Sequence, residues 1–304
     1  MAVYRIRHMT RYRYQEPVTV CHNLAHLIPR DAPQHTWTQI DLDISPDATA
    51  SSRNDYFGNR MTVFTIAEPH RELLVVSRCM VDLAPPITAS LFPTASWESV
   101  AGMLSDRPKG EWLAASEFRF QSPQISWNQA IHDWASQSFT AGRPMAEAAL
   151  DLAGRIYSEL KFVSGSTNVT TRVEEIFQKR TGVCQDFAHL AIACLRSMGL
   201  AARYVSGYLV TAPPPGQQRL IGADASHAWV SVYVPEYGWM DIDPTNHFWP
   251  LERHITVAWG RDFSDVSPLR GVILGGGKHD VKVGVDVIPL DAGEGATSPP
   301  DLPQ

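Results

Sequence analysis

Cysteine is scarce in this chain of 304 residues, and its spacing excludes two kinds of site. The cysteines are Cys21, Cys79, Cys184 and Cys194. None forms a Cys-x-x-Cys pair, so the pattern predicts neither a disulfide framework nor a zinc-binding cysteine cluster. Cys184 and Cys194 fall on one expected helix, about 15 Å apart along its axis, which is too far for a disulfide. We therefore expect free thiols, which are typical of the cytoplasm.

Long apolar runs and dense positive charge are also absent. No segment reaches the roughly 20 apolar residues of a membrane-spanning helix, and residues 1–14 lack the continuous apolar core of a signal peptide. The net charge is −6, and no run of Lys and Arg provides the basic surface that nucleic acid binding requires. We expect a cytoplasmic protein that binds neither nucleic acid nor membranes.

The composition is that of a folded protein, with 44% hydrophobic and 19% charged residues. Residues 3–7 and 10–14 alternate apolar and polar side chains, which is the period of a half-buried strand. Similar segments follow, separated by turn residues, as far as residue 81. This spacing of short antiparallel strands predicts an N-terminal β-sandwich domain over residues 1–85.

The hydrophobic period becomes helical in the second half of the chain. After an expected linker, 86–125, we predict a catalytic core over 126–290 and a disordered tail over 291–304. Helices come first in this core and strands follow, which indicates an α+β domain. The expected helices cover 144–160, 171–181 and 184–198, and the expected strands cover 202–210, 225–234 and 239–242.

Cys184 lies at a position that suits a nucleophile. Gly182 ends one expected helix, and the next helix begins at about Cys184. A helix N-terminus carries roughly half a positive charge, which favours a thiolate over a thiol. The free backbone N–H groups of the first turn can also face a developing oxyanion. Cys184 is therefore the candidate nucleophile.

A thiolate enzyme also needs a base and a group that orients the base. His227 lies on an alternating strand, and Asp241 and Asp243 lie on its expected hairpin partner. The two aspartates share strand parity, so alternation alone does not choose between them. Asp243 is the nearer, but a symmetric turn leaves it about 10 Å short of His227 unless a bulge or offset turn intervenes. A Cys on a helix, a His on a strand and a carboxylate behind it form the papain-like arrangement.

Three neighbours are candidates for supporting roles. The backbone N–H of Gln185 is a candidate for the oxyanion hole. Asp186, in the first helical turn, stabilises the helix dipole. Trp229 is expected to pack in the hairpin or to wall the substrate cleft. Cys21 and the nearby His22 have no second ligand pair, so we expect no metal site.

Several motifs together resemble the bacterial transglutaminase-like family. In the core they are Arg180-Thr-Gly-Val-Cys184-Gln-Asp-Phe, Ala202-Arg-Tyr-Val-Ser-Gly-Tyr208, Ser226-His-Ala-Trp-Val-Ser-Val-Tyr233 and Asp243-Pro-Thr-Asn246. The segments 8–17 and 55–59 resemble the β-sandwich N-terminal region of the family, and 254–262 resembles its C-terminal segment. The resemblance implies a transglutaminase-like core with a catalytic triad of Cys184, His227 and Asp243, and it requires no metal or organic cofactor.

The resemblance leaves the reaction open. Attack of the thiolate on an amide or peptide carbonyl gives a thioester, which water or a primary amine then resolves. We favour a cysteine peptidase or amidase, with a protein-glutamine transglutaminase as the alternative. A non-catalytic binding scaffold is the alternative from another class. The expected partners are a peptide or protein amide substrate and proteins that dock on the N-terminal domain.

Overall fold

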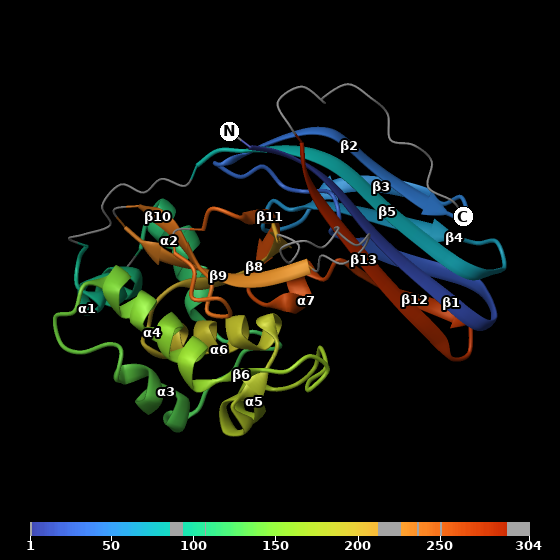
Figure 1. Ribbon diagram of the computed structural model, residues 1–304. Coiled ribbons are helices and arrows are strands. Elements are labelled where there is room, and N and C mark those ends of the chain that lie inside the picture. The colour runs from blue at the N-terminus through green and yellow to red at the C-terminus, as the bar shows by residue number, and fades with distance from the viewer. Residues whose placement is uncertain are drawn as a thin grey trace, which may run out of the picture.

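The computed structural model describes residues 2–85, 94–106, 108–211, 226–235, 237–249 and 251–290. A β-rich part and a helix-rich part lie side by side (Figure 1). The expected tail, 291–304, lies outside the described residues, as does the beginning of the expected linker, 86–93.

The β-rich part is an antiparallel sheet built around one long strand. The sheet has seven strands in the order β2-β5-β1-β4-β3, with β12 and β13 also paired to β1. The predicted antiparallel N-terminal region is confirmed. Its strands are β1 (Ala2–Ala25), β2 (His35–Ser45), β3 (Thr49–Asn54), β4 (Arg60–Ile66), β5 (His70–Leu83), β12 (Leu269–Gly275) and β13 (His279–Leu290).

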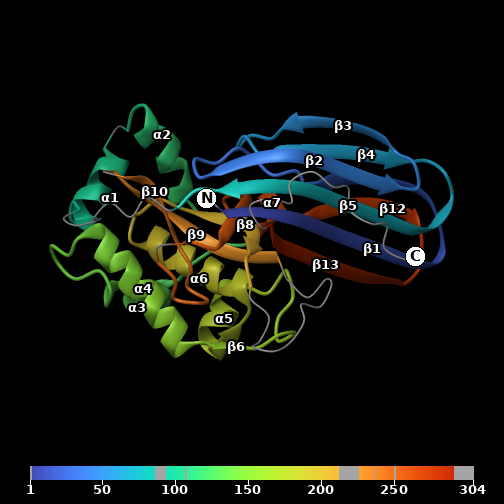
Figure 2. The same ribbon diagram turned by 45° about the horizontal axis from the view of Figure 1, so that its top comes forward.

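The last two strands correct the expected boundary of the catalytic core at residue 290. Strands β13 and β12 pair with successive halves of β1 and so belong to the N-terminal sheet, where they lie alongside it (Figure 2). The physical reason is the second edge of β1, which would otherwise present unpaired N–H and C=O groups. Alternation over 281–288 indicates a strand, but it does not specify which sheet the strand joins.

The segment expected as a linker contains helices. Helix α1 begins after Ser96, whose hydroxyl accepts a hydrogen bond from the Ser99 N–H, and it buries Val100 and Leu104. Arg119 donates hydrogen bonds to the carbonyls of Leu104 and Gly199. These contacts make the segment part of the globular core. Its helices are α1 (Trp97–Ser105), α2 (Glu111–Ser116) and the 3-10 turn η1 (Glu117–Arg119).

The core itself has the predicted α+β organisation. Helix α6 packs on a four-stranded antiparallel sheet of order β10-β9-β8-β11. The helices are α3 (Gln129–Ser136), α4 (Met145–Glu159), α5 (Val173–Lys179), α6 (Cys184–Ser197) and α7 (Phe263–Val266). The sheet strands are β8 (Ala202–Leu209), β9 (Ser226–Val234), β10 (Gly238–Ile242) and β11 (His254–Gly260). A short parallel pair, β6 (Lys161–Phe162) and β7 (Thr181–Gly182), precedes α6.

Hydrogen bonds and one stacked pair join the N-terminal sheet to the core. The Asn59 side chain donates to the Trp259 carbonyl at 2.8 Å and accepts from its N–H at 3.0 Å. The Arg30 guanidinium lies 3.1 Å from the centre of the Trp259 ring. The N-terminal part therefore lies directly against β11. Within the described ranges, no helix is long and apolar enough to cross a membrane.

Candidate active site

Cys184 is the first residue of α6, as the sequence predicts. Strand β7 leads into it, and the Gly182 carbonyl accepts a hydrogen bond from the Val163 N–H at 3.0 Å. A Cβ on Gly182 would lie 2.8 Å from the Cβ of Asp186, so only glycine fits there. The Cys184 thiol is half-buried, whereas the other three cysteines are buried.

Asp186 fixes the start of α6. Its carboxylate accepts hydrogen bonds from the Val183 N–H at 2.8 Å and from the Thr167 hydroxyl at 2.6 Å. Burial raises the pKa of Asp186, and these two hydrogen bonds oppose that rise. The carboxylate therefore satisfies a free donor at the helix start, where the helix dipole also favours a negative charge. The side-chain amide of Gln185 lies 3.4 Å from the Val169 carbonyl.

His227 lies between the thiol of Cys184 and the carboxylate of Asp243. Its Nε2 is 2.8 Å from Asp243 Oδ2, and its side chain is 9% exposed. Because Nε2 faces Asp243, Nδ1 is the ring nitrogen left for Cys184. Burial lowers the pKa of His227, but its hydrogen bonds to Asp243 and Cys184 and their negative charges outweigh burial and raise the pKa to about 9. This arrangement favours an imidazolium beside the thiol.

The carboxylate of Asp243 is fully buried and fully engaged. Oδ1 accepts hydrogen bonds from the backbone N–H groups of Thr245 at 2.8 Å and Asn246 at 3.2 Å. Oδ2 faces His227, the Asn246 amide at 2.8 Å and His254 Nε2 at 2.9 Å. Burial alone would raise the pKa of Asp243, but these donors hold it well below its ordinary value. The carboxylate is therefore an anion in a fixed orientation.

The structure distinguishes the two aspartates that strand parity leaves open. Asp241 lies on β10 and accepts a hydrogen bond from the Trp229 indole at 3.2 Å, whereas Asp243 faces His227. The ladder between β9 and β10 ends at Ile242. Beyond that residue the chain turns, so Asp243 reaches His227 without a bulge in the ladder. A regular ladder would leave Asp243 about 10 Å from His227. Asp243 closes this distance because it lies beyond the end of β10.

His254 is the residue that the sequence did not place in the site. Its buried ring donates a hydrogen bond from Nε2 to the ionised Asp243 Oδ2, and it meets the Trp229 ring edge to face at 5.0 Å. Trp229 is fully buried and also stacks near His227, at 6.1 Å. It therefore packs against both imidazoles as a fully buried residue, and the idea that it walls an open cleft is wrong. His254 begins the segment 254–262, whose resemblance to the C-terminal segment of the family does not indicate a contact with Asp243.

His227, Asp243 and His254 also have the donor types of a metal site. Their ligand atoms all lie within 4.8 Å of one another. Tetrahedral zinc with bonds of 2.0–2.1 Å would hold its ligand atoms roughly 3.3 Å apart. The two contacts of Asp243 Oδ2 are 2.8 and 2.9 Å, which are hydrogen-bond distances. The distances within this cluster therefore fit hydrogen bonds to Asp243 better than coordination of a metal ion.

Comparisons with known proteins agree with this architecture. The profile of the bacterial transglutaminase-like N-terminal region matches residues 4–82. The profile of the transglutaminase-like superfamily matches residues 132–244, which include Cys184, His227 and Asp243.

Individual proteins are also similar to this chain over much of its length. Protein Rv2569c of Mycobacterium tuberculosis is 42% identical over 95% of this chain and 93% of its own length. A protein-glutamine gamma-glutamyltransferase of Pseudomonas aeruginosa is 34% identical, over 61% of this chain and 29% of that protein. A solved structure of a candidate cysteine protease from Cytophaga hutchinsonii has a TM-score of 0.75 at 20% identity, covering 96% of this chain and 91% of that one, which indicates a common fold. The matched profiles, the near full-length relative and the common fold together show that this chain belongs to the bacterial transglutaminase-like family.

Proposed function

We propose that the protein is a thiol-dependent enzyme that transfers the acyl group of an amide or peptide, with Cys184, His227 and Asp243 as its catalytic triad. The observation that carries the proposal is the series of contacts from Cys184 to His227 and from His227 to a buried, ionised Asp243. A nucleophile, a base and an orienting group in this order are what acyl transfer requires.

The first half-reaction forms a thioester. The Cys184 thiolate attacks the carbonyl carbon of the amide, and its carbon–sulfur bond forms as the carbonyl oxygen becomes an oxyanion. Backbone N–H groups in the first turn of α6, including that of Gln185, are the proposed donors to this oxygen, because they have no acceptor within the helix. His227, as the imidazolium, then gives its proton to the leaving amine.

The second half-reaction releases the acyl group. Neutral His227 accepts a proton from the incoming nucleophile, which attacks the thioester and expels the Cys184 thiolate. Asp243 stays ionised throughout, because its hydrogen bonds fix it as an anion. We propose water as the usual nucleophile, which makes the protein a peptidase or amidase. Transfer to an amine is the second candidate, since a partial match to a protein-glutamine gamma-glutamyltransferase favours it.

A product assay with Cys184→Ala as the control tests this proposal. The native protein is incubated with a glutamine-containing peptide and a fluorescent primary amine. Hydrolysis yields acid and ammonia or a cleaved peptide, and transfer yields the labelled adduct. Cys184→Ala should give neither product, and undiminished turnover in that variant would contradict the assignment. A cytoplasmic location and partner docking on the N-terminal domain stay predictions.

A further inference from the structure

A pocket of 460 Å³ lies where the N-terminal part meets the sheet of the core. One wall is the segment 32–35, which precedes and begins β2, and the others come from the core strands and from Trp249 and Leu251. Its volume is in the range of pockets that hold small molecules. Cys184, His227 and Asp243 are not among its lining residues, although His254 is. The pocket therefore adjoins the proposed reaction centre through His254 but contains none of its three proposed catalytic residues.

A buried arginine lines this pocket. Arg203 lies on β8 and is 8% exposed. Its guanidinium lies between two indoles, at 4.2 Å from the centre of the Trp239 ring and 3.7 Å from that of Trp259. Both tryptophans also line the pocket. The aromatic faces stabilise the cation and hold its plane in one orientation.

No hydrogen bond or ion pair joins the Arg203 guanidinium to another described residue, and its buried Nε has no partner among them. Burial lowers the pKa of Arg203 to about 9, although the negative charge of Asp241 opposes that effect. Asp241 lines the same pocket but does not come within ion-pair distance of Arg203. A buried guanidinium without hydrogen-bond acceptors is costly, and the two indoles offset only part of that cost.

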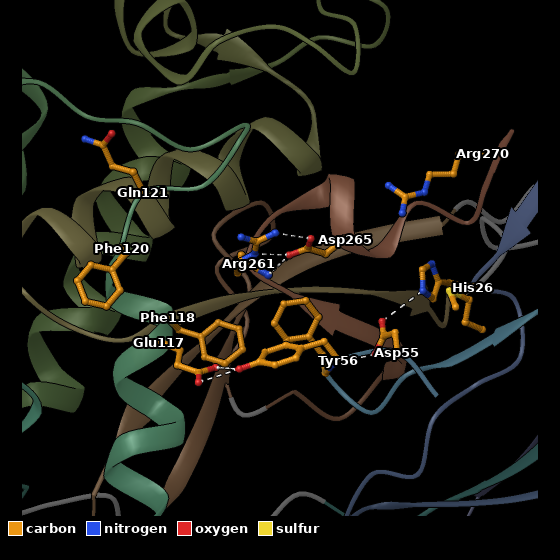
Figure 3. Close-up of a pocket in the computed structure, with 12 residues that line it drawn as sticks. His26, Asp55, Tyr56, Glu117, Phe118, Phe120, Gln121, Arg261, Asp265 and Arg270 are labelled. Atoms are coloured by element: carbon orange, nitrogen blue, oxygen red, sulfur yellow. Dashed lines mark hydrogen bonds and ion pairs between the residues drawn. The ribbon is translucent and has the colours of Figure 1, made fainter. Parts of the chain in front are cut away.

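Another cavity, of 610 Å³, provides a contrast. It lies between the N-terminal sheet and η1, and several of its polar side chains are already paired with one another (Figure 3). The pairs are Arg261 with Asp265 at 2.9 Å, Tyr56 with Glu117 at 2.8 Å, and His26 with Asp55 at 3.3 Å. Both arginines of that cavity have acceptors, Arg261 in the Asp265 carboxylate and Arg270 in the Ser264 carbonyl, whereas Arg203 has no such partner among the described residues.

We propose that the pocket around Arg203 binds an organic monocarboxylate with an aromatic or other apolar body. The two oxygens of a carboxylate match the parallel N–H groups of a guanidinium. The apolar body would lie against Trp249, Leu251 and Trp239. Asp241 disfavours a ligand with a second negative charge, so a monoanion fits better than a phosphate ester. This inference goes beyond the proposed acyl transfer and does not depend on it.

Two probes of the same shape test the charge that the pocket selects. N-acetyl-L-phenylalanine carries the carboxylate, and N-acetyl-L-phenylalaninamide replaces it with a neutral carboxamide. Binding is measured by isothermal titration calorimetry on full-length Cys184→Ala protein, so that neither probe can be turned over. We expect the acid to bind with a Kd of about 1 mM or tighter. The amide should bind roughly tenfold or more weakly, because it loses charge-assisted hydrogen bonds.

Two further substitutions locate the binding. Arg203→Met removes the cation, and Leu251→Glu adds a negative charge to the wall without altering Arg203. Each should weaken acid binding by roughly tenfold or more, whereas Leu113→Glu, the same change at a 54% exposed residue outside the pocket, should not. Leu251→Glu decides the matter if Arg203→Met fails to fold. No binding of the acid, equal binding of acid and amide, or unchanged acid binding in Leu251→Glu would each overturn the proposal.

Discussion

At the scale of single residues, the chemistry of the site depends on how one imidazole is shared between a thiol and a carboxylate. His227 has a pKa of about 9 because the neighbouring Asp243 and Cys184 outweigh its burial. The imidazolium therefore persists at neutral pH, where it can protonate a leaving amine. Its charge also stabilises the fold below the unfolded pKa of about 6.5, and that contribution is lost as the pH rises through about 9.

The first prediction concerns the alkaline limb of the pH–rate profile. Turnover should fall as the pH rises through about 9, where His227 loses its proton. In Asp243→Asn the anion that holds this proton is gone, so the limb should move to lower pH and the rate should fall by roughly 10³-fold or more. The measurement is kcat/KM against pH for both proteins. An alkaline limb at the same pH in Asp243→Asn would contradict the role given to this carboxylate.

The second prediction concerns His254, which we regard as a positioning residue. It shares Asp243 Oδ2 with His227. His254→Phe leaves that oxygen with fewer partners, so the carboxylate is less firmly held and its charge acts more fully on His227. The rate should fall by roughly tenfold and the alkaline limb should move to higher pH. His254→Gln retains an N–H donor and should restore most of both. A native pH profile in His254→Phe would reduce His254 to a packing residue.

At the scale of elements, the start of α6 could be predicted from the sequence, and the end of β10 could not. Asp186 is a local signal of the helix boundary, and its carboxylate accepts from the Val183 N–H. The expectation that Gly182 ends the preceding helix is wrong, because α5 ends at Lys179 with Arg180 in the left-handed conformation and Gly182 lies in β7. The contact of Asp243 with His227 depends on where the β9–β10 ladder stops. Alternation does not report that point, because residues of equal parity look alike in a strand pattern. The contact between Asp243 and His254 is harder still to predict, since His254 lies on another strand, β11.

The third prediction tests the start of α6. Gly182→Ala places a Cβ 2.8 Å from the Cβ of Asp186 and 2.9 Å from its Oδ2. Relieving that overlap should cost about 1–3 kcal/mol of the free energy of unfolding and displace Cys184, with a loss of activity. Gly102→Ala in α1 is the matched control, because no atom lies within 4 Å of the added Cβ. It should be neutral or stabilising by about 0.5–1 kcal/mol. Equal unfolding midpoints in urea for the two variants would contradict this account.

At the scale of the whole molecule, the first and last strands of the described residues belong to one sheet. The β12–β13 hairpin returns to β1 after the core is complete, so the N-terminal sheet contains residues from both ends of the described chain. Alternation predicts the strand over 281–288, but β12 was not predicted from the sequence. The pairing of both strands with β1 could not be predicted either, because β pairing between distant segments leaves no local pattern. The same holds for the placement of the segment 32–35 in the wall of the pocket that Arg203 lines.

The fourth prediction tests the junction between the N-terminal part and the core. Asn59 is fully buried, and its amide bonds both backbone groups of Trp259 as well as Asp55. Asn59→Ala leaves these groups without partners and should lower the free energy of unfolding by about 2–4 kcal/mol. Asn54→Ala, at an exposed position on β3, should change it by less than about 0.5 kcal/mol. Equal stability of the two variants in urea would show that the Asn59 contacts do not hold the parts together.

The most direct test of the central claim is the rate at which iodoacetamide alkylates each cysteine, followed against pH by peptide mass spectrometry. The native protein is compared with His227→Ala. Cys184 should react rapidly at a pH of about 6, where an ordinary thiol is protonated, and should slow in His227→Ala. Cys21, Cys79 and Cys194 are buried, and burial raises the pKa of each, so they should stay slow in both proteins. Slow alkylation of Cys184 at pH 6, or an equal rate in His227→Ala, would contradict the Cys184–His227 pair.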